Sequence, residues 1–250
     1  MPQDTVIAAL QLPADALVHQ RVPKKHLVEN GAPTAADKRQ INEGIEELLW
    51  IAALKPATIG VPTYRDDTRE YLEIAVLSLT LREGAKAARL SELIHRSIPY
   101  PLFLIVSQAA GLTLSLAHLR WSQGQSGQTV LDGPLTTADL PENTPTTSAF
   151  LTALNISTQP RQHLHAFYQG WIEAFETYAA ASQTGKFTPA LDPAAAESRR
   201  VALAEFQRLS REITNLRAQA DKEKQLNRRV EINLTVNRLE SQMQLLLKSL

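Results

Sequence analysis

The sequence predicts an α+β protein. A small mixed or antiparallel sheet is expected to be flanked by helices and followed by a helical C-terminal region that ends in a long coiled-coil helix. Apolar runs of strand length lie between residues 70 and 119. Beyond residue 144 the apolar residues recur at helical spacing, and beyond residue 206 they alternate three and four positions apart. These patterns predict an α+β head at 1–140, a helical linker region at 141–190 and the long coiled-coil helix at 191–250.

The composition is that of a folded cytoplasmic protein. Lys and Arg together number 26, as do Asp and Glu, so the net charge argues neither for nor against nucleic acid binding. The 250 residues include no cysteine, which excludes disulfides, thiolate zinc sites and cysteine nucleophiles. The first residues lack the basic and apolar segments of a signal peptide. We therefore expect a cytoplasmic location.

The first elements of the head are predicted to be a helix and two strands. Thr34 is expected to cap a helix, with Asp37 three residues later as its capping partner, and the helix should end at Pro56. A short strand at 58–61 and a longer strand at 70–81 follow. The longer strand is apolar on both faces, which predicts a central strand that is covered on both sides.

The rest of the head is predicted to be a helix, a hairpin and an edge strand. The apolar stretch at 98–119 contains Pro99 and Pro101, so two strands explain it better than a membrane-spanning helix. The expected elements are a helix at 84–97, strands at 102–106 and 112–119 around a turn at 108–111, an exposed loop at 122–128 and an edge strand at 130–136.

Beyond a linker at 139–147 the chain is predicted to be entirely helical. Thr144 and Pro145 suit the cap and first position of one helix, and Gly185 suits the end of a second that starts near Thr158 or Pro160. Asp192 is expected to cap the last helix. We expect that helix to run unbroken to Leu250, over about 85 Å at 1.5 Å per residue.

An apolar seam runs along this last helix. Its predicted members are Phe206, Leu209, Ile213, Leu216, Val230, Leu234, Leu239, Met243 and Leu246. A helix this long cannot bury the whole seam against a head of ordinary size. Its far end needs another helix, supplied by a second copy or by a partner protein, so we expect a homo-oligomer or a complex.

A polar break at 221–229 interrupts the seam and is the predicted docking region. Asn227 falls on a seam position, where a buried amide would fix the register of a coiled coil. The basic residues near the break and a second basic pair in the head are candidates for partner or phosphate contacts. The candidate residues are Lys24, Lys25, Asn227, Arg228, Arg229, Glu231 and Asn233.

No common catalytic motif is present. The sequence has no glycine-rich nucleotide motif, no nucleophile elbow and no paired metal-binding histidines, and it predicts no cofactor and no metal. One alternative is a divergent metal-dependent nuclease. Its carboxylates would be Asp66, Asp67, Glu70 and Glu73, but the lysine expected two positions after Glu73 is replaced by Ala75. A solvated turn that leads into a strand is the favoured explanation of this acidic cluster.

Several segments resemble a bacterial family known as domain of unknown function 4391. They are VPKK at 22–25, LLWI at 48–51, LKPATI at 54–59, the strand that begins at Glu73, IPYPLF at 98–103 and KQLNRRVEIN at 224–233. The resemblance implies a subunit that serves helicases and DNA methyltransferases, because members tend to be encoded near such enzymes in bacterial defence clusters. It implies no catalytic residue.

Three hypotheses follow from the sequence. The favoured one is a non-catalytic assembly subunit that binds itself and a helicase- or methyltransferase-type partner through its coiled coil. The second is the divergent nuclease described above. The third is a DNA-binding module that uses its basic residues, in which case binding should weaken as salt is added.

Overall fold

The computed structural model describes residues 1–109, 111–124, 127–141, 144–247 and 250. The chain forms two compact units, Met1–Phe175 and Glu176–Leu250. Each unit is described by itself below. Parts of four predicted segments lie outside the described residues: position 110 of the turn, positions 125–126 of the loop, positions 142–143 of the linker and positions 248–249 of the C-terminal helix.

The first unit is built on a mixed sheet of six strands with the order β1-β2-β5-β6-β7-β10. Neighbouring strands are antiparallel except for β5 and β6, which are parallel because helix α5 connects them. The strands are β1 (Leu17–Arg21), β2 (Ile45–Leu54), β5 (Ile74–Leu81), β6 (Leu102–Gln108), β7 (Gly111–Leu116) and β10 (Thr136–Leu140). Two small hairpins stand apart from this sheet: β3 (Tyr64–Arg65) with β4 (Glu70–Tyr71), and β8 (Leu119–Trp121) with β9 (Thr129–Leu131).

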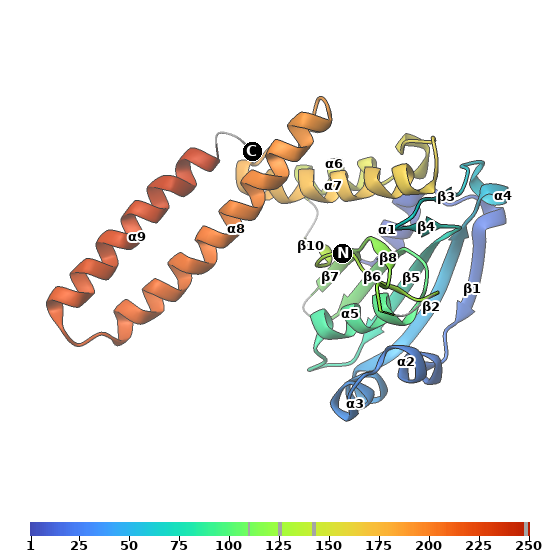
Figure 1. Ribbon diagram of the computed structural model, residues 1–250, viewed down its shortest axis with the longest axis horizontal. Coiled ribbons are helices and arrows are strands. Elements are labelled where there is room, and N and C mark those ends of the chain that lie inside the picture. The colour runs from blue at the N-terminus through green and yellow to red at the C-terminus, as the bar shows by residue number, and fades with distance from the viewer. Residues whose placement is uncertain (110, 125–126, 142–143, 248–249) are drawn as a thin grey trace. The chain divides into compact units, whose positions relative to one another are not determined.

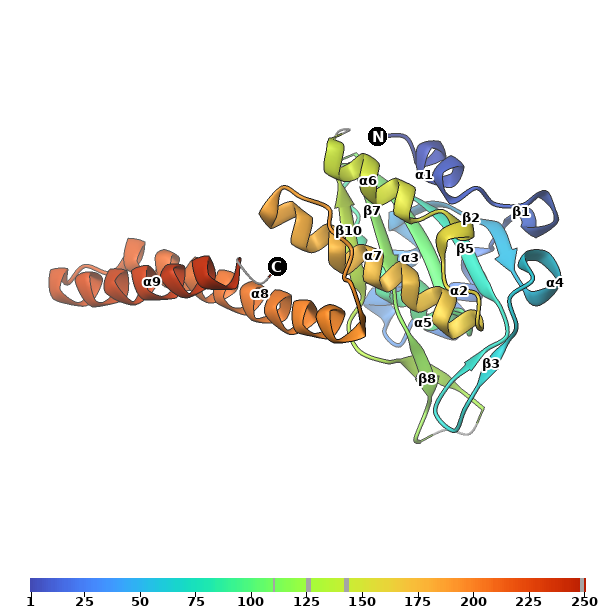
Figure 2. The same cartoon turned by 90° about the horizontal axis from the view of Figure 1, so that it is seen from above.

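Helices cover both faces of the sheet (Figures 1 and 2). The helices on one face are α2 (Lys24–Gly31), α3 (Ala35–Gly44) and α5 (Ala87–Ser97). The helices on the other are α1 (Gln3–Leu10), α6 (Pro145–Ala153) and α7 (Leu164–Thr184). On this second face Phe103 of β6 packs edge-on against Trp171 of α7, with 4.8 Å between the ring centroids. The architecture is therefore three layers, helix on sheet on helix.

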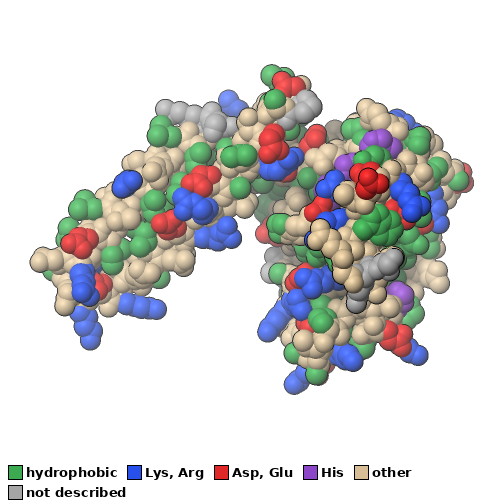
Figure 3. Space-filling model, in the orientation of Figure 1, with side chains coloured by type: hydrophobic (Ala, Val, Ile, Leu, Met, Phe, Trp, Pro, Cys, Tyr) green, Lys and Arg blue, Asp and Glu red, His purple; other side chains and the backbone are tan. Residues whose placement is uncertain are grey.

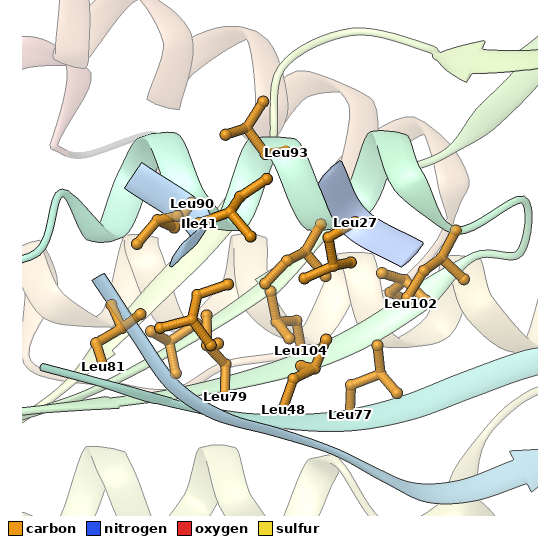
Figure 4. Close-up of a cluster of buried hydrophobic side chains, with 14 of the residues drawn as sticks. Leu27, Ile41, Leu48, Leu77, Leu79, Leu81, Leu90, Leu93, Leu102 and Leu104 are labelled. Atoms are coloured by element: carbon orange, nitrogen blue, oxygen red, sulfur yellow. The ribbon is translucent and has the colours of Figure 1, made fainter. Parts of the chain in front are cut away.

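The core beneath α5 is made almost entirely of aliphatic side chains (Figure 4). Leu90 and Leu93 of α5 and Leu77 and Leu79 of β5 belong to this core, and all four are fully buried. At about 25 cal/mol per Å² of apolar surface, burial of this kind is the main favourable term that holds α5 on the sheet.

Several sequence predictions are confirmed. The α+β class and the mixed sheet followed by C-terminal helices are present. The hairpin of β6 and β7 replaces any spanning helix at 98–119, and Phe103, Ile105 and Leu114 are all buried in it. The predicted caps also form: the side chains of Thr34, Thr144 and Asp192 each accept a hydrogen bond from the backbone of the helix that follows.

Other boundaries were wrong in the sequence prediction. The helix after Thr34 ends at Gly44, and residues 45–54 form strand β2 instead of its second half. Residues 58–61 form no strand; the short helix α4 (Pro56–Ile59) stands there. The long strand at 70–81 is divided into β4 and β5, and the edge strand at 130–136 into β9 and β10.

The second unit contains the end of α7 and two further helices, α8 (Pro193–Lys222) and α9 (Leu226–Leu246). The prediction of one unbroken helix to Leu250 is wrong. The backbone leaves the helix at Glu223, and α9 turns back along α8 to form a helical hairpin (Figure 1). The Glu223 carboxylate accepts a hydrogen bond from the Gln225 amide at 2.8 Å and so supports the turn.

Candidate interaction surface

The hairpin covers most of the predicted seam within one chain. Leu209 and Ile213 of α8 are buried against Val236 and Leu239 of α9. Other predicted seam residues, Leu216, Met243 and Leu246, pack against this cluster, and Phe206 is also buried. Arg217 of α8 and Glu240 of α9 form an ion pair of 2.6 Å beside it. The part of the seam that was expected to require a second chain therefore finds its cover in α9.

Two predicted seam residues do not join this core. Val230 and Leu234 lie on the outer side of α9 and, with Leu226, form a stripe at positions i, i+4 and i+8 of one helical face. The side chains of Leu226, Val230 and Leu234 are 64%, 49% and 63% exposed. We call these three residues the α9 stripe. Single exposed leucines are normal, but three in a row on one helical face mark a candidate contact surface.

Charged and amide side chains border the α9 stripe. Asn227, Arg228, Arg229, Glu231 and Asn233 are all exposed. The interpretation of Asn227 as a buried register-fixing amide is therefore wrong for this hairpin. Among the described residues no carboxylate lies within ion-pair distance of Arg228 or Arg229. Figure 3 shows basic side chains gathered at the end of the hairpin where α8 joins α9.

In the basic pair of the head, Lys24 contacts the end of a helix and Lys25 is exposed. The Lys24 ammonium donates to the backbone carbonyls of Asn42, at 3.0 Å, and of Ile45, and so satisfies carbonyls at the C-terminal end of α3. Burial lowers the pKa of Lys24, with Arg82 and Arg21 adding to the effect. Lys25 is exposed and lies 3.7 Å from Glu29 one turn along α2.

The acidic segment forms a turn and two ion pairs. The Asp66 carboxylate accepts hydrogen bonds from the backbone amides of Thr68 and Arg69, which closes the β3–β4 hairpin. Glu70 pairs with Arg65, and the nearly buried Glu73 pairs with Lys55 at 2.9 Å. Within the described part of the chain no group of three or more Asp, Glu or His side chains is placed to hold a metal ion.

The sequence did not reveal a polar cluster that joins the two small hairpins to α7. The Tyr71 hydroxyl and His118 Nδ1 lie 2.5 Å apart, and His118 Nε2 lies 3.0 Å from the Gln169 amide oxygen. Arg69, the residue before β4, donates a hydrogen bond from Nη2 to the Asp132 carboxylate at 2.5 Å, and its Nη1 lies 3.4 Å from His165 Nε2. The partners are between 47 and 96 positions apart in the sequence, so no local pattern could have shown the cluster.

Burial sets the protonation of this cluster. It raises the pKa of the Tyr71 hydroxyl well above its ordinary range and lowers the pKa of His165 to about 4, assisted by the neighbouring His118 and Arg69. Tyr71 and His165 are therefore neutral at pH 7. The Tyr64 ring stacks on the His165 ring with 4.9 Å between their centroids, and this contact packs the β3–β4 hairpin against the start of α7.

A family model described as Domain of unknown function (DUF4391) matches residues 10–243 of this sequence. The match covers both compact units, from the end of α1 to the last turn but one of α9. The chain belongs to this family. No curated protein and no solved structure shows significant similarity to this DUF4391 chain.

The family match includes the candidate residues at both ends of the chain. Lys24 and Lys25 lie within it, as do the α9 stripe and its bordering arginines. No helix among the described residues of this DUF4391 member is long and apolar enough to cross a membrane.

Proposed function

We propose that this protein is a non-catalytic assembly subunit that docks a helix of a partner protein on the α9 stripe. The observation that carries the proposal is the exposure of Leu226, Val230 and Leu234 on one face of a helix whose opposite face is already buried against α8. Each apolar side chain of this size gains about 1.5–3 kcal/mol when it is removed from water, so covering the stripe is favourable.

The charges beside the stripe favour a particular kind of partner. Arg228 and Arg229 stand next to the stripe with no carboxylate within ion-pair distance among the described residues, whereas Arg208 and Arg217 of α8 both have acidic partners. An amphipathic helix with two or three apolar residues and acidic neighbours would match both features. We therefore propose a protein partner with an acidic amphipathic helix.

The sequence predicted self-association because the seam was expected to need a helix from another chain. In this structure α9 of the same chain covers most of the seam, so that argument no longer applies. The α9 stripe spans two helical turns, about 12 Å at 1.5 Å per residue, which suits one crossing helix better than a long coiled coil. The partner class that we propose is a helicase- or DNA methyltransferase-type protein of a bacterial defence system, which is the machinery that the family resemblance implies.

Co-purification from a native host tests the proposal. Val230→Glu places a charge in the middle of the stripe, and Asn215→Glu places the same charge on an exposed position of α8 as a matched control. We expect the wild type and Asn215→Glu to retain the same partner chain in fixed stoichiometry, and Val230→Glu to lose it, because burying an unpaired carboxylate is costly.

Two results would overturn the proposal. One is equal recovery of every partner with both variants. The other is a wild type that sediments as a dimer and a Val230→Glu variant that sediments as a monomer, which would make a second copy the occupant of the stripe. Nuclease activity that requires Mg²⁺ or Mn²⁺ and disappears in Glu73→Ala would contradict the non-catalytic role itself.

A further inference from the structure

One face of the sheet is left partly uncovered beside α5. On strands β7 and β10 the side chains alternate, so that Leu112, Leu114 and Leu116 are buried on the α7 face. The opposite face of β7 carries Thr113 and Ser115, and Ser115 identifies it as the α5 face because it contacts His95 of that helix. This end of the sheet therefore presents hydroxyl groups where its centre presents leucines.

A cavity of about 840 Å³ stands over this polar face. Ala87, Ala88 and Glu92 of α5 form one wall, and Leu131, Pro134 and Leu135 form the other. Asp139 on the floor accepts a hydrogen bond from Thr113 at 2.7 Å. The volume falls within the range of sites for small organic ligands. The lining combines apolar walls with the carboxylates of Asp139 and Glu92, and Glu92 also pairs with Arg89 at 2.8 Å and Arg96 at 2.6 Å.

A second cavity of about 420 Å³ adjoins the first, because Arg96 and Leu131 line both. It adds the side chains of Arg120, Ser122 and Thr129, and no carboxylate is among the described residues that line it. Two guanidinium groups with hydroxyl donors nearby are the chemistry that binds phosphate.

Both arginines are held in place by contacts that leave donors available. The Glu92 carboxylate pairs with Nη2 of Arg96 at 2.6 Å. The Trp121 carbonyl accepts a hydrogen bond from Nη1 of Arg120 at 3.2 Å, and Asp132 Oδ1 lies 3.7 Å from Nε of Arg120. A guanidinium group has five N–H donors, so each side chain is oriented by its partner and can still donate to an anion.

We propose that the two cavities together bind one organic phosphate of the nucleotide class. The nucleoside lies in the larger cavity, where Leu131 and Leu135 pack against its flat ring and Asp139 and Glu92 accept hydrogen bonds from its hydroxyl or amino groups. The phosphate lies in the smaller cavity and receives hydrogen bonds from Arg96 and Arg120. This site differs from glycine-rich nucleotide motifs because side chains, and not a helix N-terminus, hold the phosphate. It lies wholly within residues 1–175 and is independent of the α9 stripe.

Isothermal titration of the full-length protein tests this site with four nucleoside 5′-monophosphates, the matching nucleosides, ribose 5-phosphate and inorganic phosphate. We expect at least one nucleotide to bind, and its nucleoside and inorganic phosphate each to bind at least about tenfold more weakly, since each fills one cavity only. Arg96→Gln should weaken binding of the nucleotide by about tenfold or more and binding of the nucleoside by much less, because the proposed role of Arg96 is to bind the phosphate. Arg39→Gln is the matched control, because Arg39 also pairs with a glutamate one turn away on an exposed helix face.

A second variant distinguishes a loss of binding from a loss of folding. Ala88 is exposed at the mouth of the larger cavity, so Ala88→Phe should fill that cavity without disturbing the core, and it should abolish nucleoside binding while thermal unfolding is unchanged. Absence of heat with every nucleotide at millimolar concentration overturns the proposal. So does nucleotide binding that is unchanged by both Arg96→Gln and Ala88→Phe. Stronger binding of ribose 5-phosphate than of all four nucleotides overturns the assignment of the larger cavity to a nucleoside.

Discussion

Asp37 is a charged residue that the fold buries and uses to join two helices. Its carboxylate in α3 accepts hydrogen bonds from the Arg89 guanidinium of α5, at 2.8 and 3.0 Å, and from the Thr34 hydroxyl at 2.7 Å. These hydrogen bonds, that from Arg89 first, lower the pKa of Asp37 from 3.8 to about 2. The ionised Asp37 carboxylate is thus more stable in the folded protein than in the unfolded chain.

The stability that Asp37 contributes should depend on pH in a defined direction. A lowered carboxylate pKa contributes stability that is fully present above about pH 4 and is lost as the pH falls through about 2. We expect Asp37→Asn to lower the midpoint of thermal unfolding at pH 7 and to differ much less from the wild type at pH 2. Glu43→Gln, in an exposed ion pair with Arg39, should change little at either pH. An equal loss at both pH values for Asp37→Asn would contradict the ionic role.

His95 should make the protein less stable in mild acid. The imidazole is fully buried, lies 3.0 Å from the Ser115 hydroxyl, and has a pKa that burial lowers from 6.5 to about 3. Between those values the unfolded chain binds a proton that the folded chain excludes, so stability falls as the pH drops, by at most about 1.4 kcal/mol per pH unit.

Urea titrations at several pH values between 6.5 and 4 measure this effect. His95→Gln removes the titrating group and keeps an amide that can contact Ser115, so its stability should vary less with pH, by about one proton. His19→Gln is the control, because His19 is exposed on β1. A slope that is the same in all three proteins would show that His95 is not responsible.

At the scale of single elements, helices α2 and α5 pack so closely that only glycine fits at one position. A Cβ atom on Gly31 would lie 1.7 Å from the Ser97 hydroxyl oxygen and 2.9 Å from the backbone carbonyl oxygen of Leu93. The Ser97 hydroxyl is itself fixed by a 2.6 Å hydrogen bond to that carbonyl. Any side chain at position 31 must therefore push the two helices apart.

We expect Gly31→Ala to destabilise the protein by about 1–3 kcal/mol, the usual cost of overpacking, although alanine is the better helix former. The free energy of unfolding from chemical denaturation checks this. Gly124→Ala is the control, because nothing lies within 4 Å of a Cβ atom at that position. A Gly31→Ala protein as stable as the wild type would show that the helices move apart at no cost.

The elements predicted correctly are those with strong local signals. Proline and threonine at 144–145 and the aspartate at 192 mark helix starts whatever surrounds them, and their caps formed as expected. Strand β2 was missed because Ile45, Leu48 and Leu49 also fit helical spacing and leucine is a good helix former. Pairing with β5 over eight matched positions decides in favour of the strand, and no local pattern reports that pairing.

The turn between α8 and α9 was missed for a related reason. Residues 221–226 contain no glycine and no proline, so the usual signals for ending a helix are absent. The polar break was visible in the sequence, but a break in a long helix and a turn between two helices look alike locally. Burial of Ile213 and Leu209 against Val236 and Leu239 distinguishes them, and this depends on residues 23 or more positions apart.

At the scale of the whole molecule, the seam of the hairpin can be disrupted separately from the sheet. Ile213→Glu introduces an unpaired charge between α8 and α9, which should cost enough to unfold the hairpin. We expect circular dichroism to show lost helix, and thermal unfolding of the sheet-containing unit, residues 1–175, to persist. Ile213→Val should leave both unchanged. Complete unfolding of the Ile213→Glu chain would show that the two units do not fold separately.

How much of the candidate surface the sequence revealed depends on the residue. The basic and amide residues at 227–233 could be singled out as candidates because a run of polar residues within an apolar repeat is visible locally, and all of those named are exposed. The sequence did not show which seam residues pack between α8 and α9 and which are exposed. Whether Val230 faces α8 or solvent is decided by the direction in which the chain turns at Glu223, and that direction comes from packing.

The two outer strands of the sheet, β1 and β10, determine whether copies of this protein can pair through their backbones. In β1 the pairing with β2 shifts between Leu17 and Gln20, and His19 adopts a left-handed backbone with φ of 49°. At the other edge β10 lies between Pro134 and Pro141, which have no amide hydrogen to offer. Neither edge gives an incoming strand a long straight ladder to extend, so amyloid-like growth through backbone pairing is discouraged. Recognition by this protein is thereby left to side chains, which can tell one partner from another.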